Sequence, residues 1–233
     1  MRLAIISDIH GNLEALETAL EIIAKNNIDE IICLGDIVGY GASPNECVEL
    51  VFQHTSHVLL GNHDHAAVHI EAAEYFNPYA RIAIEWTHDT LTVKNKKILS
   101  NLPYTLERYN IMFVHASPYQ PERWFYINNL VNAHENFPHY SQPLCFVGHS
   151  HLPAVFCDDN VTKEVNKEQR FIVNVGSIGQ PRDHNNKLSF GIFDTVTWTY
   201  ENIREGYNIS KASGKIYKAG LPPILGDRLF EGK

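Results

Sequence analysis

The sequence predicts an α/β fold in which two packed β-sheets are flanked by helices. The first half of the chain alternates short apolar runs with amphipathic stretches, which is typical of parallel strands joined by helices. The second half consists mostly of apolar runs separated by turns, which adds further strands. The chain has 233 residues, of which 44% are hydrophobic and 20% are charged. A chain of this length and composition can bury one core, so we expect a single domain over residues 1–233.

The first part of the chain is expected to hold three strands and two helices. Each strand is a short apolar run. Leu13, Leu16 and Leu20 recur at helical spacing, which indicates the first helix. The second helix has Pro44 directly after Ser43, a favourable helix start. The expected strands span 2–7, 30–35 and 57–61, and the expected helices span 12–27 and 43–53.

The rest of the chain changes from helical to strand character. Helical spacing dominates from about residue 63 to 101, and two strands around a tight turn at 109–110 are expected over 104–117. Residues 118–142 are aromatic and rich in loop formers, and whether 66–142 forms a lid over a substrate stays open. The remaining strands are expected at 144–150, 154–160, 161–169 and 170–177, followed by a hairpin at 187–203 and a last helix near 208–219.

Charge and hydropathy narrow the possible partners. The formal net charge is −8, and Lys and Arg are scattered instead of forming the basic stripe of proteins that bind long nucleic acid. No apolar run reaches the ~18 residues that a membrane span needs. The first residues lack the apolar run of a signal peptide, so we expect a cytoplasmic protein. The sequence does not indicate an oligomeric state.

Polar side chains capable of binding metals follow five of the apolar runs. In open α/β sheets, ligands bind outside the carboxyl ends of the strands, so these side chains are expected to meet at one edge. Asp8 and His10, like His149 and His151, are two residues apart, and in an extended chain both side chains of such a pair point the same way. The full set is Asp8, His10, Asp36, Asn62, His63, Asp64, His115, His149 and His151.

This mixture of carboxylates, an amide and imidazoles predicts a metal site. Buried carboxylates are costly without compensation, and divalent cations provide it. Nitrogen and oxygen ligands without thiolate suit manganese, iron, zinc or cobalt. There are more ligands than one ion needs, which favours two ions bridged by a shared carboxylate. Such pairs perform in-line displacement at phosphorus, and their positive charge attracts small phosphorylated substrates.

Five motifs, in order, resemble those of the calcineurin-like metallophosphoesterases. The similarity covers nearly the whole chain and is closest to the small bacterial and archaeal phosphodiesterase-like branch. It implies the four-layer fold of that family, with two central sheets and helices outside. The motifs are DIHGN (8–12), GDIVGYG (35–41), GNHD (61–64), the histidine of FVHAS (113–117) and GHSH (148–151).

The resemblance implies a role for each residue of the site. One metal ion would be held by Asp8, His10 and His151, and the other by Asn62, His115 and His149. Asp36 would bridge the two ions, and a hydroxide shared by them would attack phosphorus. His63 would stabilise the developing charge or protonate the leaving oxygen, and Asp64 would orient His63.

The substrate is predicted only as a class. Phosphodiesters and nucleotide anhydrides, including dinucleoside polyphosphates, fit the family, whereas a phosphomonoesterase or protein phosphatase is the near alternative. A non-catalytic scaffold on the same fold is a further alternative. Arg182 could reach a substrate phosphate or could be a surface cation. Arg123, with the neighbouring Trp124, could shape a pocket for a nucleobase.

Overall fold

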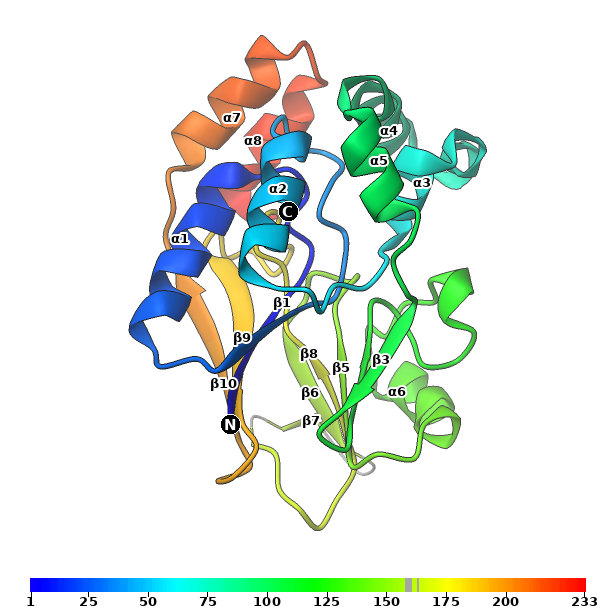
Figure 1. Ribbon diagram of the computed structural model, residues 1–233, viewed down its shortest axis with the longest axis vertical. Helices are drawn as coiled ribbons and strands as arrows, with labels where there is room; N and C mark the ends of the chain where they lie inside the picture. Colours follow the sequence, from blue (N-terminus) through cyan, green and yellow to red (C-terminus); the bar gives the residue numbers. More distant parts are fainter. Residues whose placement is uncertain (158–160, 163) are drawn as a thin grey trace.

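The computed structural model describes residues 1–157, 161–162 and 164–233 of the chain. Within these residues, the strands form two sheets that face each other, with helices outside them and above one end (Figure 1). One sheet has four strands in the order β10-β9-β1-β2, and the other has six in the order β3-β4-β5-β8-β6-β7. The predicted two-sheet α/β sandwich is therefore confirmed.

The four-stranded sheet combines the two ends of the chain. Strands β1 and β2 are parallel and are joined by helix α1, whereas β9 pairs antiparallel with both β1 and β10. The strands span Arg2–Ile6 (β1), Glu30–Cys33 (β2), Leu188–Asp194 (β9) and Thr199–Glu205 (β10). The first strand of the chain is thus paired with the last hairpin, which is formed by β9 and β10.

The expected third strand at 57–61 is reduced to a single parallel bridge between Cys33 and Val58. Leu59 still donates its backbone N–H to Cys33, but Leu60 donates to the carbonyl of Pro103 instead (2.8 Å). The segment therefore leaves the sheet after about two residues. It still follows the direction of β2, so the residues after it arrive at the same edge.

The six-stranded sheet is built from the middle of the chain. Strands β4, β5 and β8 are parallel, and β3 and β6 flank them antiparallel. Tyr109 and Asn110, both with φ near +57°, form the predicted tight turn between β3 and β4. The strands span Thr105–Arg108 (β3), Ile111–Val114 (β4), Leu144–Val147 (β5), Ala154–Cys157 (β6), Val161–Thr162 (β7) and Phe171–Asn174 (β8).

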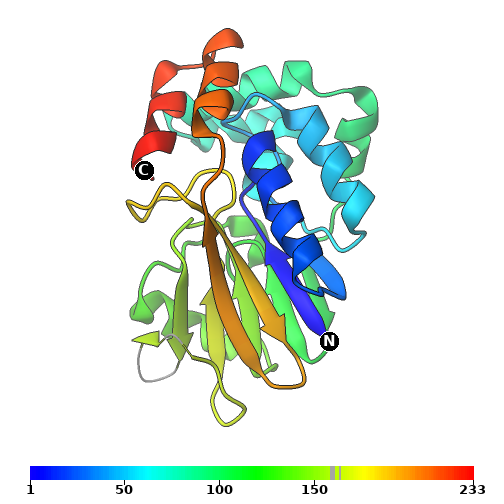
Figure 2. The ribbon, with the colours of Figure 1, turned by 90° about the vertical axis from the view of Figure 1, so that its left-hand side faces the viewer.

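Alternation along the strands creates two apolar layers. In β1, Leu3 and Ile5 point between the sheets, where they meet Phe113 and Phe146 of the other sheet. The alternate residues of β1 pack against α1 (Leu13–Lys25) and α2 (Pro44–His54) on the outer face. Helix α6 (Leu130–Asn136) covers the outer face of the six-stranded sheet. The order of layers is helix, sheet, sheet, helix (Figure 1), and the view turned by 90° shows the four-stranded sheet in front of the six-stranded one (Figure 2).

The remaining helices gather above the carboxyl ends of the parallel strands (Figure 1). The helices at 78–90, 209–218 and 223–231 share a small apolar cluster that also contains Tyr40, whereas those at 62–68 and 93–99 pack into the larger cluster around β1 and α1. They span Asn62–Val68 (α3), Pro78–Thr90 (α4), Val93–Leu99 (α5), Ile209–Lys218 (α7) and Pro223–Glu231 (α8), with short 3-10 turns at Ile70–Tyr75 (η1), Pro121–Arg123 (η2) and Phe137–His139 (η3).

Several expected elements differ from those observed. The strand expected at 161–169 is limited to β7 in the described residues, and residues 158–160 of the strand expected at 154–160 lie outside them. Helices α6 and α8 were not predicted. The helix expected near 208–219 is α7, but the chain continues into α8 because Pro223 occupies the first turn of a helix, where its missing N–H costs nothing.

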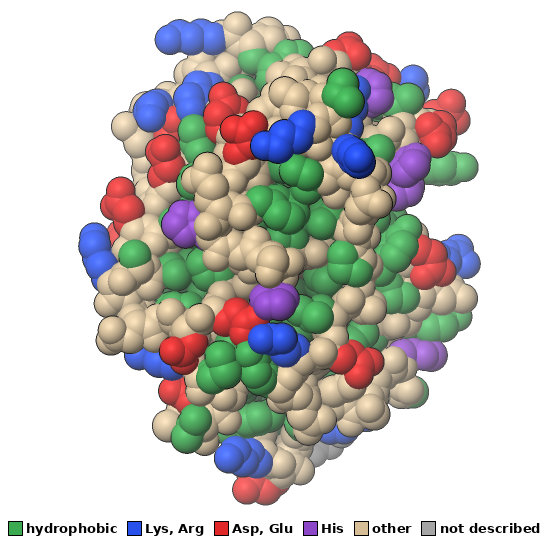
Figure 3. All heavy atoms as spheres, viewed as in Figure 1, with side chains coloured by type: hydrophobic (Ala, Val, Ile, Leu, Met, Phe, Trp, Pro, Cys, Tyr) green, Lys and Arg blue, Asp and Glu red, His purple; other side chains and the backbone are tan. Residues whose placement is uncertain are grey.

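Two properties of the structure bear on the partners that the sequence disfavours, which are membranes and long nucleic acid. Among the described residues, no helix has both the length and the apolar content that a membrane crossing requires. On the face seen in Figure 3, Lys and Arg side chains lie among Asp and Glu side chains and form no continuous stripe.

Candidate active site

Loops at the carboxyl ends of the parallel strands bring the predicted residues together. Asp8 and His10 follow β1, and Asp36 follows β2. From the other sheet, His115 follows β4, while His149 and His151 follow β5. The three polar residues of GNHD do not lie in a loop: Asn62, His63 and Asp64 form the first turn of α3. Both sheets therefore contribute to one site.

The possible ligand atoms fall into three buried clusters that share members. Within each cluster these atoms lie within 4.8 Å of one another, and every residue is buried. The outer two clusters match the two predicted metal positions, and His63 joins the middle one. The clusters are Asp8, His10 and His151; His10, Asp36 and His63; and Asp36, His115 and His149. They fit two cations held around a shared carboxylate.

The two aspartates direct one oxygen each into the centre. Asp8 Oδ2 accepts the backbone N–H of His149 (2.9 Å), which leaves Oδ1 3.2 Å from His151 Nε2. Asp36 Oδ1 accepts the backbone N–H of His63 (2.8 Å), and its Oδ2 lies 3.3 Å from His115 Nε2 and 3.7 Å from His10 Nε2. Asp36 thus lies between the two outer clusters, where a bridging ligand is needed.

The close contact between the rings of His10 and His151 tests whether a metal cation fits between them. His10 Nδ1 lies 3.1 Å from the carbonyl of Val38, and His151 Nδ1 lies 2.6 Å from that of Gln180, so each Nδ1 donates its proton. In neutral rings both Nε2 atoms then carry lone pairs, yet they are only 3.0 Å apart. A cation bound by both nitrogens would remove the repulsion between these lone pairs, so the donor pair fits a shared metal ion.

Other buried polar atoms at the site also have no protein partner. Asn62 Oδ1 and His149 Nε2 are inaccessible to solvent and form no hydrogen bond. Buried side-chain polar atoms are normally satisfied, and unsatisfied ones call for an unseen ion or water. The donor set therefore fits metal ions in chemistry as well as in position.

The backbone of the site is strained. Five of the seven predicted ligands have φ between +51° and +64°, a region that side chains other than glycine rarely adopt. Such strain concentrates at functional sites, where the surrounding structure enforces it. It also corrects the expectation of an extended chain at 8–10 and 149–151: the paired residues lie in tight turns, and His149 and His151 join different clusters. The five are Asp8, His10, Asp36, His149 and His151.

Two glycines allow these turns to approach one another. A Cβ atom at Gly61 would lie 2.1 Å from Asp36 Oδ1, and one at Gly148 would lie 2.5 Å from Asp8 Oδ2. Any larger residue would push a carboxylate out of place. The glycines of GNHD and GHSH are therefore required by close packing against the two aspartates.

Charges in the site perturb its pKa values strongly. Burial would raise the pKa of Asp36, but the neighbouring imidazoles, His115 first among them, outweigh it and hold that pKa well below its usual range. Burial would lower the pKa of His115, but Asp36 and Asp8 raise it to about 9. The pKa of His149 is instead lowered to about 3, because burial and the charge of His115 both disfavour its protonation. The site thus combines charged carboxylates with one imidazole, His115, that favours its charged form and another, His149, that favours its neutral form.

His63 is enclosed by aromatic rings. Its ring centroid lies 4.7 Å from that of His10, 4.5 Å from that of Tyr40 and 4.8 Å from that of Phe76. Burial lowers the pKa of His63 to about 4. The ring is held in place by packing.

The carboxylate of Asp64 accepts hydrogen bonds from the backbone, and His63 Nδ1 has no hydrogen-bond partner among the described residues. The donors to Asp64 are the backbone N–H groups of Ile37 (2.9 Å), Val38 (3.1 Å) and Gly61 (3.2 Å). These contacts therefore do not support the prediction that Asp64 orients His63 directly. Asp64 fixes the loop after β2 to the start of α3, and so acts on His63 only through the backbone.

The two arginines predicted to bind substrate lie in different surroundings. Arg182 donates to Tyr40 Oη (3.3 Å) and to Gln180 Oε1 (2.9 Å), and its guanidinium lies 5.7 Å from the centre of the Tyr40 ring. Its charge also disfavours protonation of His63 and His151. Arg123 is exposed and lies over the ring of Phe125 instead. The structure brings Arg182 to the site and not Arg123.

Two tyrosines at the site were missed by the sequence analysis. Tyr40 lies in GDIVGYG with φ +59°, between glycines, and packs its ring against His10 (4.8 Å between centroids). Tyr126 stacks on His149, with centroids 4.0 Å apart. The only signals were an aromatic residue inside a metal motif and the aromatic content of 118–142.

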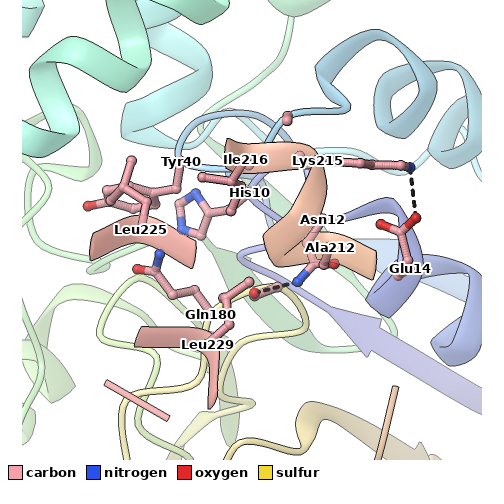
Figure 4. Close-up of a pocket in the computed structure, with 14 residues that line it drawn as sticks. His10, Asn12, Glu14, Tyr40, Gln180, Ala212, Lys215, Ile216, Leu225 and Leu229 are labelled. Carbon is pink, nitrogen blue, oxygen red and sulfur yellow. Dashed lines mark hydrogen bonds and ion pairs between the residues drawn. The ribbon is translucent and has the colours of Figure 1, made fainter. Parts of the chain in front are cut away.

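The C-terminal helices close the back of the site. Ala212 and Ile216 of α7 and Leu225 and Leu229 of α8 line a small cavity behind His10 and Tyr40 (Figure 4). These helices therefore support the loop that carries Tyr40, and they lie beyond the segment that holds the metal motifs.

Comparison with known proteins agrees with this geometry. The calcineurin-like phosphoesterase superfamily domain matches residues 1–197. An uncharacterized protein of Methanocaldococcus jannaschii is 42% identical, over 99% of this chain and 98% of its own length. Phosphodiesterase YfcE of Escherichia coli is 27% identical, over 83% of this chain and 88% of its own.

Among solved structures, a metallophosphoesterase from Sphaerobacter thermophilus superposes with a TM-score of 0.90 at 38% identity, covering 100% of this chain and 99% of that one. The folds of the two chains therefore agree over nearly their whole lengths. The chain belongs to the calcineurin-like phosphoesterase superfamily, a family of metal-dependent phosphoesterases.

Proposed function

We propose that this chain is a phosphodiesterase that uses two divalent cations and acts on small phosphorylated molecules. The observation that carries the proposal is the set of three overlapping buried ligand clusters, in which the middle one links the outer two through His10 and Asp36. Asp8, His10 and His151 would hold one ion, Asn62, His115 and His149 the other, and Asp36 both. Bound there, the cations would supply Lewis-acid stabilisation at phosphorus and lower the pKa of water in the site.

The protein's own residues would orient the reaction. Asp8 and Asp36 each fix one oxygen on a backbone N–H group, which aims the other oxygen at the centre. His63, held by packing, would transfer a proton to the leaving oxygen or stabilise its charge, a contribution of about 10²–10⁴-fold. Tyr40 and Arg182 are linked at the open side of His63, where Arg182 would bind a non-bridging phosphate oxygen.

Two findings favour a diester over a monoester. A pocket of about 240 Å³ lies beside His63 and His149 and leaves room for a second group on phosphorus. The curated relative in Escherichia coli is named a phosphodiesterase. A phosphomonoesterase or protein phosphatase has no comparable support.

Nucleotide anhydrides are a second candidate because of an additional cation near Arg182. The guanidinium of Arg228, on α8, lies 5.8 Å from the centre of the same Tyr40 ring. Neither arginine forms an ion pair with a side-chain carboxylate in the described part of the chain. The pair would suit a substrate that carries more than one phosphate, such as a dinucleoside polyphosphate.

The test compares hydrolysis of bis-p-nitrophenyl phosphate, p-nitrophenyl phosphate and diadenosine tetraphosphate with Mn²⁺, Fe²⁺, Zn²⁺ or Co²⁺. We expect the diester to have the highest kcat/KM, and His63→Ala to lower it by about 10²–10⁴-fold. His69→Ala, which changes an exposed histidine just beyond α3, is the matched control and should retain activity.

Other outcomes separate the alternatives. A higher kcat/KM for the anhydride would favour the second candidate, and one for the monoester would contradict a phosphodiesterase. Absence of hydrolysis with every metal would favour a non-catalytic scaffold.

A further inference from the structure

The pocket beside the candidate active site is walled by aromatic side chains. It has a volume of about 240 Å³ and opens next to Asn62, His63 and His149. Among the described residues, none of those that line it is Asp, Glu, Lys or Arg. The aromatic residues of its wall are Tyr40, Tyr75, Phe76, Trp124 and Tyr126.

These aromatic residues come from separate segments and do not all serve the core. Tyr40 follows β2, Phe76 ends η1, and Trp124 and Tyr126 follow η2. The side chain of Tyr75 is 91% exposed and that of Tyr126 is 49% exposed. Aromatic rings left open to water contribute little to folding, and exposed aromatic surface beside a reactive centre marks a binding site.

The walls of the pocket touch the reactive residues directly. Tyr126 stacks on His149 with an interplanar angle of 21°, and Phe76 packs on His63. Trp124 presents its ring to His115, with centroids 5.9 Å apart. A group in the pocket is therefore within reach of a bond to the phosphorus that these residues surround. The pocket is placed to take one ester group of the substrate.

We infer that this pocket binds a planar aromatic group, a nucleobase in a natural substrate, which makes the chain a nucleotide-directed phosphodiesterase. The inference rests on the proposed diesterase function. Stacking between a base and an aromatic side chain is a sequence-tolerant source of affinity, and the amide side chain of Asn77 adds a polar group to the lining.

A quaternary ammonium group is the main competitor, because aromatic walls also bind cations. Two features disfavour it. The lining offers no carboxylate, and the proposed pair of divalent cations next to the pocket would repel a positive group. A nucleobase is neutral and meets neither obstacle.

The experiment uses three diesters with the same p-nitrophenolate leaving group: methyl p-nitrophenyl phosphate, thymidine 5′-(p-nitrophenyl phosphate) and p-nitrophenyl phosphorylcholine. The full chain loaded with Mn²⁺ is expected to prefer the thymidine ester over the methyl ester by about tenfold or more in kcat/KM. Trp124→Ala and Tyr126→Ala should each bring this ratio towards one, with a smaller change for the methyl ester.

Phe125→Ala is the matched control. Phe125 lies between the two pocket residues in sequence, but its ring stacks on Tyr119 and lies under Arg123. It should leave the ratio unchanged. Tyr126→Phe retains the ring and should also preserve the ratio. Circular dichroism and unfolding temperatures verify that each variant is folded.

Each failure has a different meaning. A ratio near one in the unmodified protein, or a preference for the choline ester, overturns the pocket assignment and leaves the diesterase in place. If no diester is hydrolysed with any metal, the proposed function fails. Calorimetry with thymidine 5′-phosphate then decides the pocket alone: binding that Trp124→Ala weakens by about tenfold supports it, and equal or absent binding overturns it.

Discussion

The space between the two sheets and the ends of the same strands are equally buried but built in opposite ways. Ile5 of β1 and Asp8, in the loop just after β1, are both 0% exposed. Ile5 lies in regular extended backbone among apolar side chains, whereas Asp8 lies three residues later on left-handed backbone among imidazoles. Burial at Ile5 stabilises the fold. Burial at Asp8 carries a desolvation cost that a bound cation would help to offset, so the two regions should respond oppositely to mutation.

The largest effect on stability is expected from Phe146→Ala, in the space between the sheets. Phe146 is 0% exposed and contacts the rings of Phe113, Phe193 and Tyr200. Removing it leaves a cavity that these rings cannot fill, at a cost of about 3–5 kcal/mol in the free energy of unfolding. Urea unfolding of metal-free protein measures this value. A loss below about 1 kcal/mol would contradict the close packing inferred between the sheets.

The opposite response is expected at the strand ends, for Asn62→Ala. If Asn62 binds metal, its loss should lower kcat/KM by about 10²–10³-fold, more than removal of a group that only supports a ligand. In metal-free protein, however, the change deletes the unsatisfied Oδ1 and places alanine in the first turn of α3. The free energy of unfolding should therefore stay constant or rise by about 0.5 kcal/mol.

The matched control for this variant is Asn26→Ala, which removes an asparagine just after α1, near the start of β2 and hence at the other end of the strand. It should retain activity. Full activity of Asn62→Ala would remove Asn62 from the ligand set, and a loss of stability above about 1 kcal/mol would mean that Asn62 supports the fold.

The difference between the regions also explains what the sequence could predict. Periodicity located α1 and the strands well, because apolar spacing reports the same burial that holds the sheets together. The site residues could be grouped because parallel strands end at one edge. Their geometry could not, since the left-handed turns at Asp8 and His149 depend on close packing of distant loops.

Local rules failed where tertiary contacts decide. The apolar run at 57–61 reads as a strand, but Leu60 pairs with Pro103 and leaves the sheet. The last helix is expected near 208–219, but Pro223 begins a further helix, α8. Tyr126 lies in an irregular segment, so no periodic pattern places its ring on His149. The aromatic content of residues 118–142 thus indicates a pocket, but only the fold shows which side chains line it.

Metal binding should restore part of the stability that the strand ends lack. At a free Mn²⁺ concentration about 100-fold above the dissociation constant, one bound ion stabilises the folded state by about 2.7 kcal/mol. We expect the unfolding temperature to rise with Mn²⁺ and to fall again with a chelator. Asp36→Asn, which weakens both predicted positions, should lose most of this response. An unfolding temperature independent of metal, or an unchanged response in Asp36→Asn, would contradict a site shared through Asp36.

The smallest effect is expected at Glu14, a buried charge next to the strand ends that is satisfied by the protein itself. Its carboxylate lies 2.7 Å from Lys215 Nζ and 3.1 Å from Lys211 Nζ, so α7 is fixed to the first turn of α1 (Figure 4). Burial would raise the pKa of Glu14, but hydrogen bonds from these lysines outweigh it and lower the pKa. Because one partner is exposed to solvent, Glu14→Gln should cost only about 1 kcal/mol at pH 7.

The pH dependence of that cost identifies its origin. A lowered pKa in the folded state means that the contribution of Glu14 is complete above its usual pKa of 4.5 and is lost as the pH falls through the lower, folded value. The difference in unfolding free energy between the unmodified protein and Glu14→Gln should therefore shrink at about pH 3. Glu17→Gln, on the exposed side of the same helix, should show no difference at either pH. If the cost of Glu14→Gln is the same at both pH values, the side chain stabilises the protein by packing and not by its charge. The contrast between Glu14, whose charge is paired within the protein, and the charged residues of the metal site would then not hold.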